Sequence, residues 1–350
     1  MNLPDRYELL GDSMDGGMSS VFPYRDRTLE RKVALKVIPP GPNRRRINDE
    51  LLALFKLRSK HVVQVYDVLT DATSLGIVQE FIEGSDLFCD NIAPGDGNSY
   101  LRMIWQIASG ISEVHAAGLI HRDIKPNNMK VDHEGILKIY DFGLARDDGP
   151  NAATVGFVGT HGFAAPELYR TSATFTKAVD TYAFGATALY FGARNLPDEM
   201  LQKPPVALTH NYFSALPFAI DPSLCELLHR CLAFDPSDRP DMTAVRTEIE
   251  RHLLFDKHRA LVIFKGNASY LDSQNRSVKL KYGNIGEVSI SYDGFSFAVT
   301  AVSGEIFVNN APARVGRRLP GACVLTMGAH ERGRDREYVT FDLSNPGIVL

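Results

Sequence analysis

The chain reads His121-Arg122-Asp123-Ile124-Lys125-Pro126-Asn127-Asn128, and thirteen residues after Asn128 it reads Asp141-Phe142-Gly143. The first stretch joins a carboxylate that can accept a proton, Asp123, to an amide oxygen at Asn128, and the second stretch adds the carboxylate of Asp141. Oxygen atoms of these kinds are the ligands that magnesium takes in proteins. The two stretches therefore predict a site that accepts a proton and holds a divalent cation beside it.

Together the two stretches resemble the catalytic loop and the metal-binding motif of serine/threonine protein kinases, in the form found in bacteria. The resemblance runs from residue 7 to about residue 254. It implies an α+β, two-lobed protein kinase fold over residues 1–255, with an N-lobe over about 1–80 and a C-lobe over about 84–255. It also implies transfer of the γ-phosphate of ATP to a protein, with Mg²⁺ or Mn²⁺ as the cation. In this pattern Asp123 accepts the proton, and Asn128 and Asp141 bind the metal.

Lys125 indicates which hydroxyl accepts the phosphate. The serine/threonine pattern places a lysine two residues past the catalytic aspartate, where it neutralises the γ-phosphate during transfer, and tyrosine-specific relatives place their basic residue elsewhere. Lys125 has that position. The resemblance therefore implies serine or threonine as the acceptor.

A second group of residues resembles the part of the family that grips the nucleotide phosphates. Val33-Ala34-Leu35-Lys36 reads as the strand that carries the phosphate-pairing lysine, and Glu50 follows fourteen residues after Lys36. Glu50 lies in a run, residues 47–54, whose apolar residues recur at helical spacing. By resemblance Glu50 turns inward to hold Lys36 against the phosphates, and Ala34 lies beside the nucleotide.

The segment before that strand resembles the loop that covers the nucleotide. Gly16, Gly17 and Val21 are its expected contacts, but Met14 and Ser19 occupy the first and third of the usual glycine positions. Glycine there lets backbone amides approach phosphate without steric cost. We therefore expect a reshaped loop with weaker nucleotide affinity.

The connector between the lobes is expected in the run from Ile77 to Gly84. By resemblance Glu80 and Ile82 supply the backbone groups that bind adenine, and Gln79 lies at the entrance to the back of the pocket. Lys130 stands where the family usually places an aliphatic side chain beneath adenine. A lysine stem can cover apolar surface while its amine reaches water.

The segment from Asp141 to Ala165-Pro166-Glu167 resembles an activation segment. Thr154 lies at the position of an autophosphorylation site in bacterial relatives, which implies transient self-association, and Arg122 is the expected partner of the added phosphate. A solvated loop threonine is the alternative. Thr160, in the Gly159-Thr160 pair, is expected beneath the acceptor residue.

Two further positions resemble structural residues of the family. Glu167 and Arg239 match the ion pair that ties the activation segment to the C-lobe. Asp180 matches the helix residue that holds the backbone of the catalytic loop.

Composition fits an ordinary globular protein of 350 residues, with 44% hydrophobic and 23% charged residues. A formal charge of −4 gives no general attraction to nucleic acid or to an anionic membrane. The four cysteines lack metal-ligand spacing and are expected as reduced thiols. Without an apolar run of eighteen residues or a signal-peptide pattern, we expect a cytoplasmic protein.

After Phe255 the sequence changes to short β-prone runs separated by Gly, Asn, Asp and Pro, which predicts an all-β, sandwich-like domain over residues 256–350. Its late strands weakly resemble forkhead-associated domains, which bind phosphothreonine. Arg276 falls at that family's arginine, but Asn284 and Glu287 replace its serine and histidine. Because a carboxylate repels phosphate, a protein-contact module is favoured over a phosphopeptide reader.

Three functions stay open: a serine/threonine protein kinase, a pseudokinase scaffold and a small-molecule kinase. The complete set of catalytic residues favours the first. Met14, Ser19 and Lys130 motivate the second. The third is disfavoured because Ala165-Pro166-Glu167 and the Gly159-Thr160 pair are features of kinases that take polypeptides.

Overall fold

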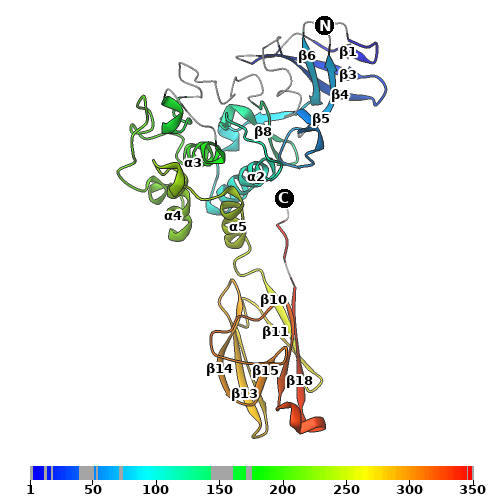
Figure 1. The fold of residues 1–350 in the computed structure, drawn as a ribbon, viewed down its shortest axis with the longest axis vertical. Helices are drawn as coiled ribbons and strands as arrows, with labels where there is room; N and C mark the ends of the chain where they lie inside the picture. Colours follow the sequence, from blue (N-terminus) through cyan, green and yellow to red (C-terminus); the bar gives the residue numbers. More distant parts are fainter. Residues whose placement is uncertain are drawn as a thin grey trace. The chain divides into compact units, whose positions relative to one another are not determined.

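The computed structural model of the protein describes residues 3–11, 14–16, 19–38, 51–52, 54–70, 74–142, 161–170, 176–344 and 346–348. The chain divides into two compact units, residues 1–249 and 250–349 (Figure 1). The sequence places the boundary after Phe255, and that finer boundary stays a prediction.

The first unit opens with an antiparallel sheet in the strand order β1-β3-β4-β6-β5, and β2 pairs with β3 (Figure 1). The strands are β1 (Tyr7–Leu9), β2 (Met14–Gly16), β3 (Ser19–Asp26), β4 (Arg31–Ile38), β5 (Val65–Thr70) and β6 (Leu75–Glu80). Val33 and Leu35 of β4 are buried in one apolar cluster with Tyr7 and Val78. Because side chains alternate along a strand, Ala34 and Lys36 share the opposite face.

The helical lobe follows. Its helices are α2 (Gly97–Ala116), α3 (Lys177–Ala193), α4 (Pro222–Cys231) and α5 (Met242–Leu253), with 3₁₀ turns η1 (Asp90–Ile92), η2 (Pro126–Asn128), η3 (Pro166–Tyr169), η4 (Tyr212–Ala215) and η5 (Pro236–Asp238). Asp96 starts α2 with a capping box, since its carboxylate accepts from the Ser99 N–H at 2.7 Å. α3 is buried along most of its length and forms the centre of the lobe.

A small antiparallel sheet, β7 (Gly84–Asp86), β8 (Met129–Asp132) and β9 (Leu137–Ile139), flanks the loop of Asp123. Gly84 lies opposite Asp132, and a Cβ at Gly84 would overlap the carbonyl oxygen of Val131. Glycine is therefore required for β7 to lie this close to β8. That approach places Asp86 opposite Lys130, beside the end of the catalytic loop.

The second unit consists of two antiparallel sheets around one core (Figure 1). One has the order β11-β10-β18-β17-β15-β16 and the other β12-β13-β14. The elements are β10 (Arg259–Phe264), β11 (Asn267–Leu271), β12 (Ser277–Tyr282), β13 (Gly286–Tyr292), β14 (Phe297–Gly304), β15 (Ile306–Val308), β16 (Ala311–Pro312), β17 (Ala322–Met327), β18 (Glu337–Ser344) and η6 (His330–Asp335). Buried side chains from both sheets, such as Val262, Ile290 and Phe341, fill the core. A two-lobed α+β unit followed by an all-β unit is the architecture that the sequence predicts.

Candidate active site

The loop that carries Asp123 is held in shape by a buried carboxylate from α3. Asp180 Oδ2 accepts a hydrogen bond from the backbone N–H of His121 at 2.8 Å, and Asp180 Oδ1 accepts one from the N–H of Arg122 at 2.8 Å. The φ of Arg122 is 71°, a left-handed conformation that arginine rarely takes. The two hydrogen bonds that Asp180 accepts stabilise that conformation, so the expected role of Asp180 is confirmed.

Asp123 lies in a cluster of polar side chains from its own loop. Its Oδ2 is 3.0 Å from Lys125 Nζ and accepts a hydrogen bond of 3.1 Å from Asn128 Nδ2. Asn128 Nδ2 also donates to the carbonyl oxygen of Asp123 at 2.7 Å. Because the amide nitrogen is used on Asp123, the amide oxygen of Asn128 is the atom that can face a cation. The structure thus brings three of the sequence-predicted residues together.

Lys36 reaches the site from β4. Its Nζ pairs with the carboxylate of Asp141. Asp141 has a left-handed φ of 61°, and the next residue, Phe142, packs against His121 with ring centroids 4.5 Å apart. Asp141 is therefore placed between a cation of the sheet lobe and a buried aromatic contact.

The oxygen atoms of Asn128 and Asp141 fit a divalent cation. Asn128 offers an amide oxygen, and the Asp141 side chain is 43% exposed, so solvent and ligands can reach its carboxylate. Magnesium is commonly held by one or two protein oxygen ligands together with substrate phosphates. This donor set agrees with the cation that the sequence predicts.

The residues expected around the nucleotide are spread over the sheet lobe and the connector. Val21 of β3 lies opposite Lys36 of β4, and Ala34 shares the face of Lys36. The Glu80 carboxylate is engaged elsewhere, because its Oε1 is 2.8 Å from Lys138 Nζ. Any contact of Glu80 with adenine therefore falls to its backbone, as the sequence suggests. Ile82 is half-buried and packs against the apolar cluster that contains Phe142.

Of the residues expected in the loop that covers the nucleotide, Gly16 is described: it ends β2, where it pairs with Ser19. Six expected residues lie outside the described part of the chain: Gly17, Glu50, Gly143, Thr154, Gly159 and Thr160. The Lys36–Glu50 pair and the phosphorylation of Thr154 stay predictions.

The sequence reasoning missed Tyr140 and Asp86. The Tyr140 hydroxyl lies 2.6 Å from the carbonyl oxygen of Asn127 and 3.3 Å from Asp86 Oδ1. Burial, reinforced by Asp86, raises the pKa of the Tyr140 phenol well above its ordinary value, so the hydroxyl is protonated and donates. The available signal was an aromatic residue directly before Asp141, but the sequence does not give the direction of its side chain.

A small hollow adjoins Asp123 on the side of the helical lobe. It is lined mainly by small and apolar residues: Arg122, Asp123, Ile124, Phe163, Ala164, Ala165, Leu168, Val179 and Ala183. Residues 161–170, which include the end of the expected activation segment, supply four of these positions, and they place apolar surface next to the carboxylate that is expected to receive the proton.

A family model described as the protein kinase domain matches residues 6–249. The chain belongs to the protein kinase family. Among its relatives, the probable serine/threonine-protein kinase CPE1738 of Clostridium perfringens is 32% identical over 253 residues, which cover 68% of this chain and 36% of that protein. The serine/threonine-protein kinase PrkC of Bacillus subtilis is 30% identical over 214 residues, 59% of this chain and 33% of that protein. The chain thus spans about a third to a half of the length of several curated relatives that it matches.

The fold of the protein kinase family is also seen in a solved structure. A crystal structure of Rad53, residues 1–466, in complex with AMP-PNP superposes with a TM-score of 0.56 and 24% identity, over 69% of this chain and 64% of that one. At this identity the likeness shows the fold alone. The bacterial relatives and the family match confirm the resemblance to bacterial-type serine/threonine kinases.

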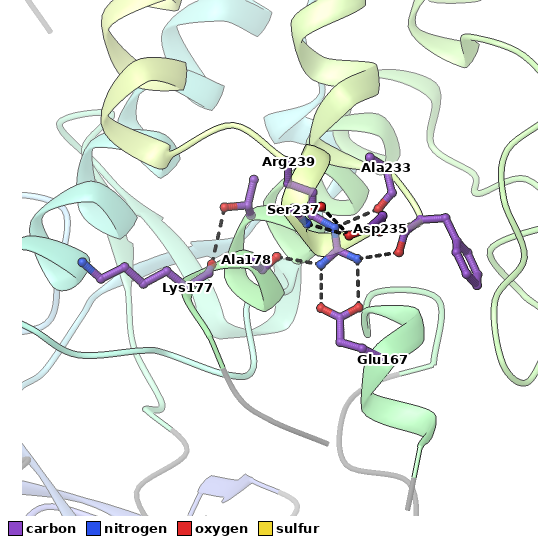
Figure 2. Close-up of polar contacts among 9 residues, drawn as sticks. Glu167, Lys177, Ala178, Ala233, Asp235, Ser237 and Arg239 are labelled. Atoms are coloured by element: carbon purple, nitrogen blue, oxygen red, sulfur yellow. Dashed lines mark hydrogen bonds and ion pairs between the residues drawn. The ribbon is translucent and has the colours of Figure 1, made fainter. Parts of the chain in front are cut away.

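The ion pair expected in this family joins the end of the expected activation segment to the turn before α5. Figure 2 shows the Arg239 guanidinium facing Glu167, with hydrogen bonds of 2.7 and 2.8 Å between them. The remaining N–H groups of Arg239 donate to the carbonyl oxygens of Ala233, Ala178 and Phe234, at 2.8, 2.9 and 3.3 Å. All five donors of the guanidinium therefore have acceptors.

The second unit lies outside the region matched by the kinase family. Arg276, its expected phosphate-binding residue, is 2.6 Å from Asp256 Oδ2, and Glu287 Oε1 is 2.7 Å from Lys279 Nζ. Both basic groups are thus already paired with carboxylates. The resemblance to forkhead-associated domains stays a prediction.

Across the residues that the structure describes, no helix has both the length and the apolar character needed to cross a membrane.

Proposed function

We propose that this chain is a serine/threonine protein kinase that transfers the γ-phosphate of ATP to serine or threonine hydroxyls of proteins. The cluster of Asp123, Lys125 and Asn128, with Lys36 and Asp141 beside it, is the observation that carries the proposal. The family match and the names of the bacterial relatives support it.

Each residue of the cluster has a role in this reaction. Asp123 accepts the proton of the attacking hydroxyl, and the oxygen of that hydroxyl forms the new bond to phosphorus while the bond to the β-phosphate oxygen breaks. Lys125, 3.0 Å from Asp123, neutralises the transferred phosphoryl group. Lys36 binds the α- and β-phosphates, which requires its ammonium to move from Asp141 or to bridge Asp141 and the phosphates.

Asn128 and Asp141 would hold the cation. A bound Mg²⁺ or Mn²⁺ ion would neutralise phosphate charge and orient the phosphates for transfer. Asn128 is pre-set for this role, because its amide nitrogen is tied to Asp123 and its oxygen is directed away. The expected adenine contacts are the backbone groups of Glu80 and Ile82, with Gly16, Gly17, Val21 and Ala34 around the nucleotide.

The direct test is transfer of labelled phosphate. The purified full chain is incubated with γ-labelled ATP, Mg²⁺ and a generic protein, beside the Asp123→Asn variant, which keeps the side-chain shape but cannot accept a proton. We expect label on serine and threonine and a rate far above that of the variant. Transfer no faster than in Asp123→Asn would overturn the proposal, and label on tyrosine would overturn the acceptor class.

The proposed partners follow from this reaction. Protein substrates are the main partners, and two kinase molecules associate transiently for autophosphorylation. The second unit is assigned to protein contact rather than to phosphopeptide binding, because Arg276 is paired with Asp256. We place the protein in the cytoplasm, where ATP is available and the four thiols, all free in the structure, stay reduced.

A pseudokinase scaffold is the second candidate, and a specific observation favours it. The Tyr140 side chain lies directly before Asp141, and its hydroxyl is bonded to Asp86 and to the Asn127 carbonyl. This side chain, like the sequence departures at Met14, Ser19 and Lys130, would weaken nucleotide binding. Retention of a partner protein by a chain that binds no nucleotide would support the scaffold.

A further inference from the structure

The Tyr140 side chain lies where the sugar of a bound nucleotide is expected. A nucleotide that meets both the connector at Ile82 and the metal-binding oxygens of Asn128 and Asp141 has its sugar between them. Acceptor oxygens border this interval, because Asp86 lies at the end of β7 and the Asn127 carbonyl lies next to Asn128. The Tyr140 phenol is bonded to both.

The Tyr140 backbone is fixed at both of its polar groups. Its N–H donates to the carbonyl oxygen of Asn128 at 2.9 Å, and its carbonyl oxygen accepts from His121 Nε2 at 3.1 Å. His121 Nδ1 accepts from the Asp123 N–H at 3.3 Å, so the imidazole is neutral with its proton on Nε2. Burial lowers the pKa of His121, which agrees with this state. Any change at Tyr140 is therefore a rotation of its side chain.

The pairing of β7 with β8 brings the Asp86 acceptor to the phenol. The close approach of β7 to β8 at Gly84 sets Asp86 opposite Lys130. Lys130 Nζ lies 6.0 Å from the centre of the Tyr140 ring, at the outer limit of a cation–π contact. Tyr140 and Ile82 are both half-buried and pack against the same apolar cluster. The ring and the connector residue Ile82 thus share one apolar support.

The hydrogen bonds of the phenol are unequal. A tyrosine hydroxyl has one proton, yet two acceptors face it, the Asn127 carbonyl at 2.6 Å and the Asp86 carboxylate at 3.3 Å. The hydroxyl proton is donated in the shorter bond, to the Asn127 carbonyl, so the Asp86 carboxylate receives only a weak hydrogen bond from the phenol. A pair of neighbouring sugar hydroxyls has two protons and can satisfy both acceptors. The site is therefore better matched to a ribose than to the side chain that occupies it.

We propose that Tyr140 is a gate on the nucleotide site: its phenol takes the place of the ribose hydroxyls on Asp86 and Asn127, and it swings away when a ribonucleotide binds. This inference rests on the function proposed above. The gate lowers the apparent nucleotide affinity by the fraction of molecules in which it is open. It also favours ligands that have the hydroxyls to replace it.

The test is a double comparison of side chain and sugar. Calorimetry gives the dissociation constants of Mg²⁺–ATP and Mg²⁺–2′,3′-dideoxy-ATP for the full chain and for Tyr140→Phe, which keeps the ring and removes the hydroxyl. One lost hydrogen bond should strengthen ATP binding by roughly 3- to 10-fold. The affinity for dideoxy-ATP should increase less, because this nucleotide has no sugar hydroxyls to donate to Asp86 and the Asn127 carbonyl. Tyr140→Leu, which keeps apolar packing but cannot reach Asp86, should behave in the same way.

Tyr212→Phe is the matched control, since the Tyr212 hydroxyl also donates to a carboxylate, that of Glu199, at 3.0 Å. It should leave both affinities unchanged. Equal or weaker ATP binding by Tyr140→Phe, with unaltered thermal unfolding, would overturn the gate, as would equal gains for the two nucleotides. If the wild-type chain and both Tyr140 variants bind no nucleotide, the proposed kinase function itself fails. If they bind ATP and transfer phosphate but do not differ, only the gate fails.

Discussion

Arg239 donates two parallel hydrogen bonds to the Glu167 carboxylate (Figure 2). The Arg239 side chain is fully buried, and the Glu167 side chain is 11% exposed. The Tyr182 ring lies 5.0 Å from the guanidinium and covers it. The pair joins η3, at the end of the activation segment, to the turn before α5. Because both charges are buried, removal of one partner leaves the other unpaired and strongly destabilises the fold.

We predict that Arg239→Ala destabilises the first unit by about 3–5 kcal/mol, because it leaves the Glu167 carboxylate buried without a cation. The single tryptophan of the chain, Trp105, lies on α2 and reports the unfolding of this unit in urea. Arg230→Ala, which removes an exposed arginine of α4, is the control and should shift the midpoint little. A midpoint for Arg239→Ala equal to that of Arg230→Ala would show that the pair is not an anchor.

Asp123→Ala should reduce phosphate transfer by about 10²–10⁴-fold, because that is the usual contribution of a positioned general base. Its fold should persist, since Asp180, not Asp123, holds the loop backbone. The initial rate of labelled transfer and the Trp105 fluorescence spectrum check the two statements. Wild-type turnover in a folded Asp123→Ala protein would remove this residue from the mechanism.

Asp141→Ala should abolish the dependence of nucleotide affinity on magnesium, because it removes the carboxylate that is expected to bind the metal. Calorimetry with ATP, with and without Mg²⁺, measures this dependence. Asp198→Ala removes an exposed carboxylate of the helical lobe and should keep the wild-type response. An undiminished effect of magnesium in Asp141→Ala would mean that another group holds the ion.

Asp26 should contribute to the free energy of unfolding of the sheet lobe, and this contribution should decrease at acidic pH. Hydrogen bonds of 2.7 Å from Arg6 lower the pKa of the buried Asp26 carboxyl from 3.8 to about 2. A lowered folded-state pKa gives stability that is complete above 3.8 and is lost as the pH falls toward 2. The urea midpoint of Asp26→Asn should therefore lie below wild type at pH 6, and the gap should narrow by pH 3. Asp5→Asn, at an exposed position, should leave no such gap. A gap that is constant with pH would contradict the assignment.

The residues of the site that could be predicted from the sequence are those that lie close together along the chain. Asp123, Lys125 and Asn128 belong to one loop, so their spacing alone brings them together. The short β-prone runs after Phe255 likewise predicted that the second unit is all-β. The order of its strands in the two sheets depends on pairing between distant runs, which these local patterns do not contain.

Contacts between distant segments could not be predicted from local patterns. Glu167 and Arg239 are 72 residues apart, and only the family resemblance pointed to them. Tyr140 reaches Asp86, 54 residues earlier, because of the register in which β7 pairs with β8. The sequence around Tyr140 does not determine that register. The contact between the Tyr140 hydroxyl and Asp86, at the proposed sugar position, therefore could not be predicted from the sequence.

The last prediction concerns Thr154, which lies outside the described residues and rests on the sequence. We expect one kinase molecule to phosphorylate Thr154 of another, and the phosphate to pair with Arg122 and raise activity. A phosphothreonine carries about −1.5 to −2 charges at pH 7 and accepts several charge-assisted hydrogen bonds, which is enough to order a segment. The backbone of Arg122 is fixed by Asp180 next to Asp123, so its side chain extends from a defined position.

Mass spectrometry of the chain after incubation with Mg²⁺ and ATP should find phosphate on Thr154, at a rate per molecule that rises with protein concentration. Thr154→Ala should lower activity, whereas Thr28→Ala, at an exposed threonine of the sheet lobe, should not. Arg122→Ala should erase the difference in rate between phosphorylated and phosphatase-treated protein, because the charge then has no partner. If active protein carries an unmodified Thr154, or if phosphatase leaves the wild-type rate unchanged, the segment must be ordered by its own packing instead.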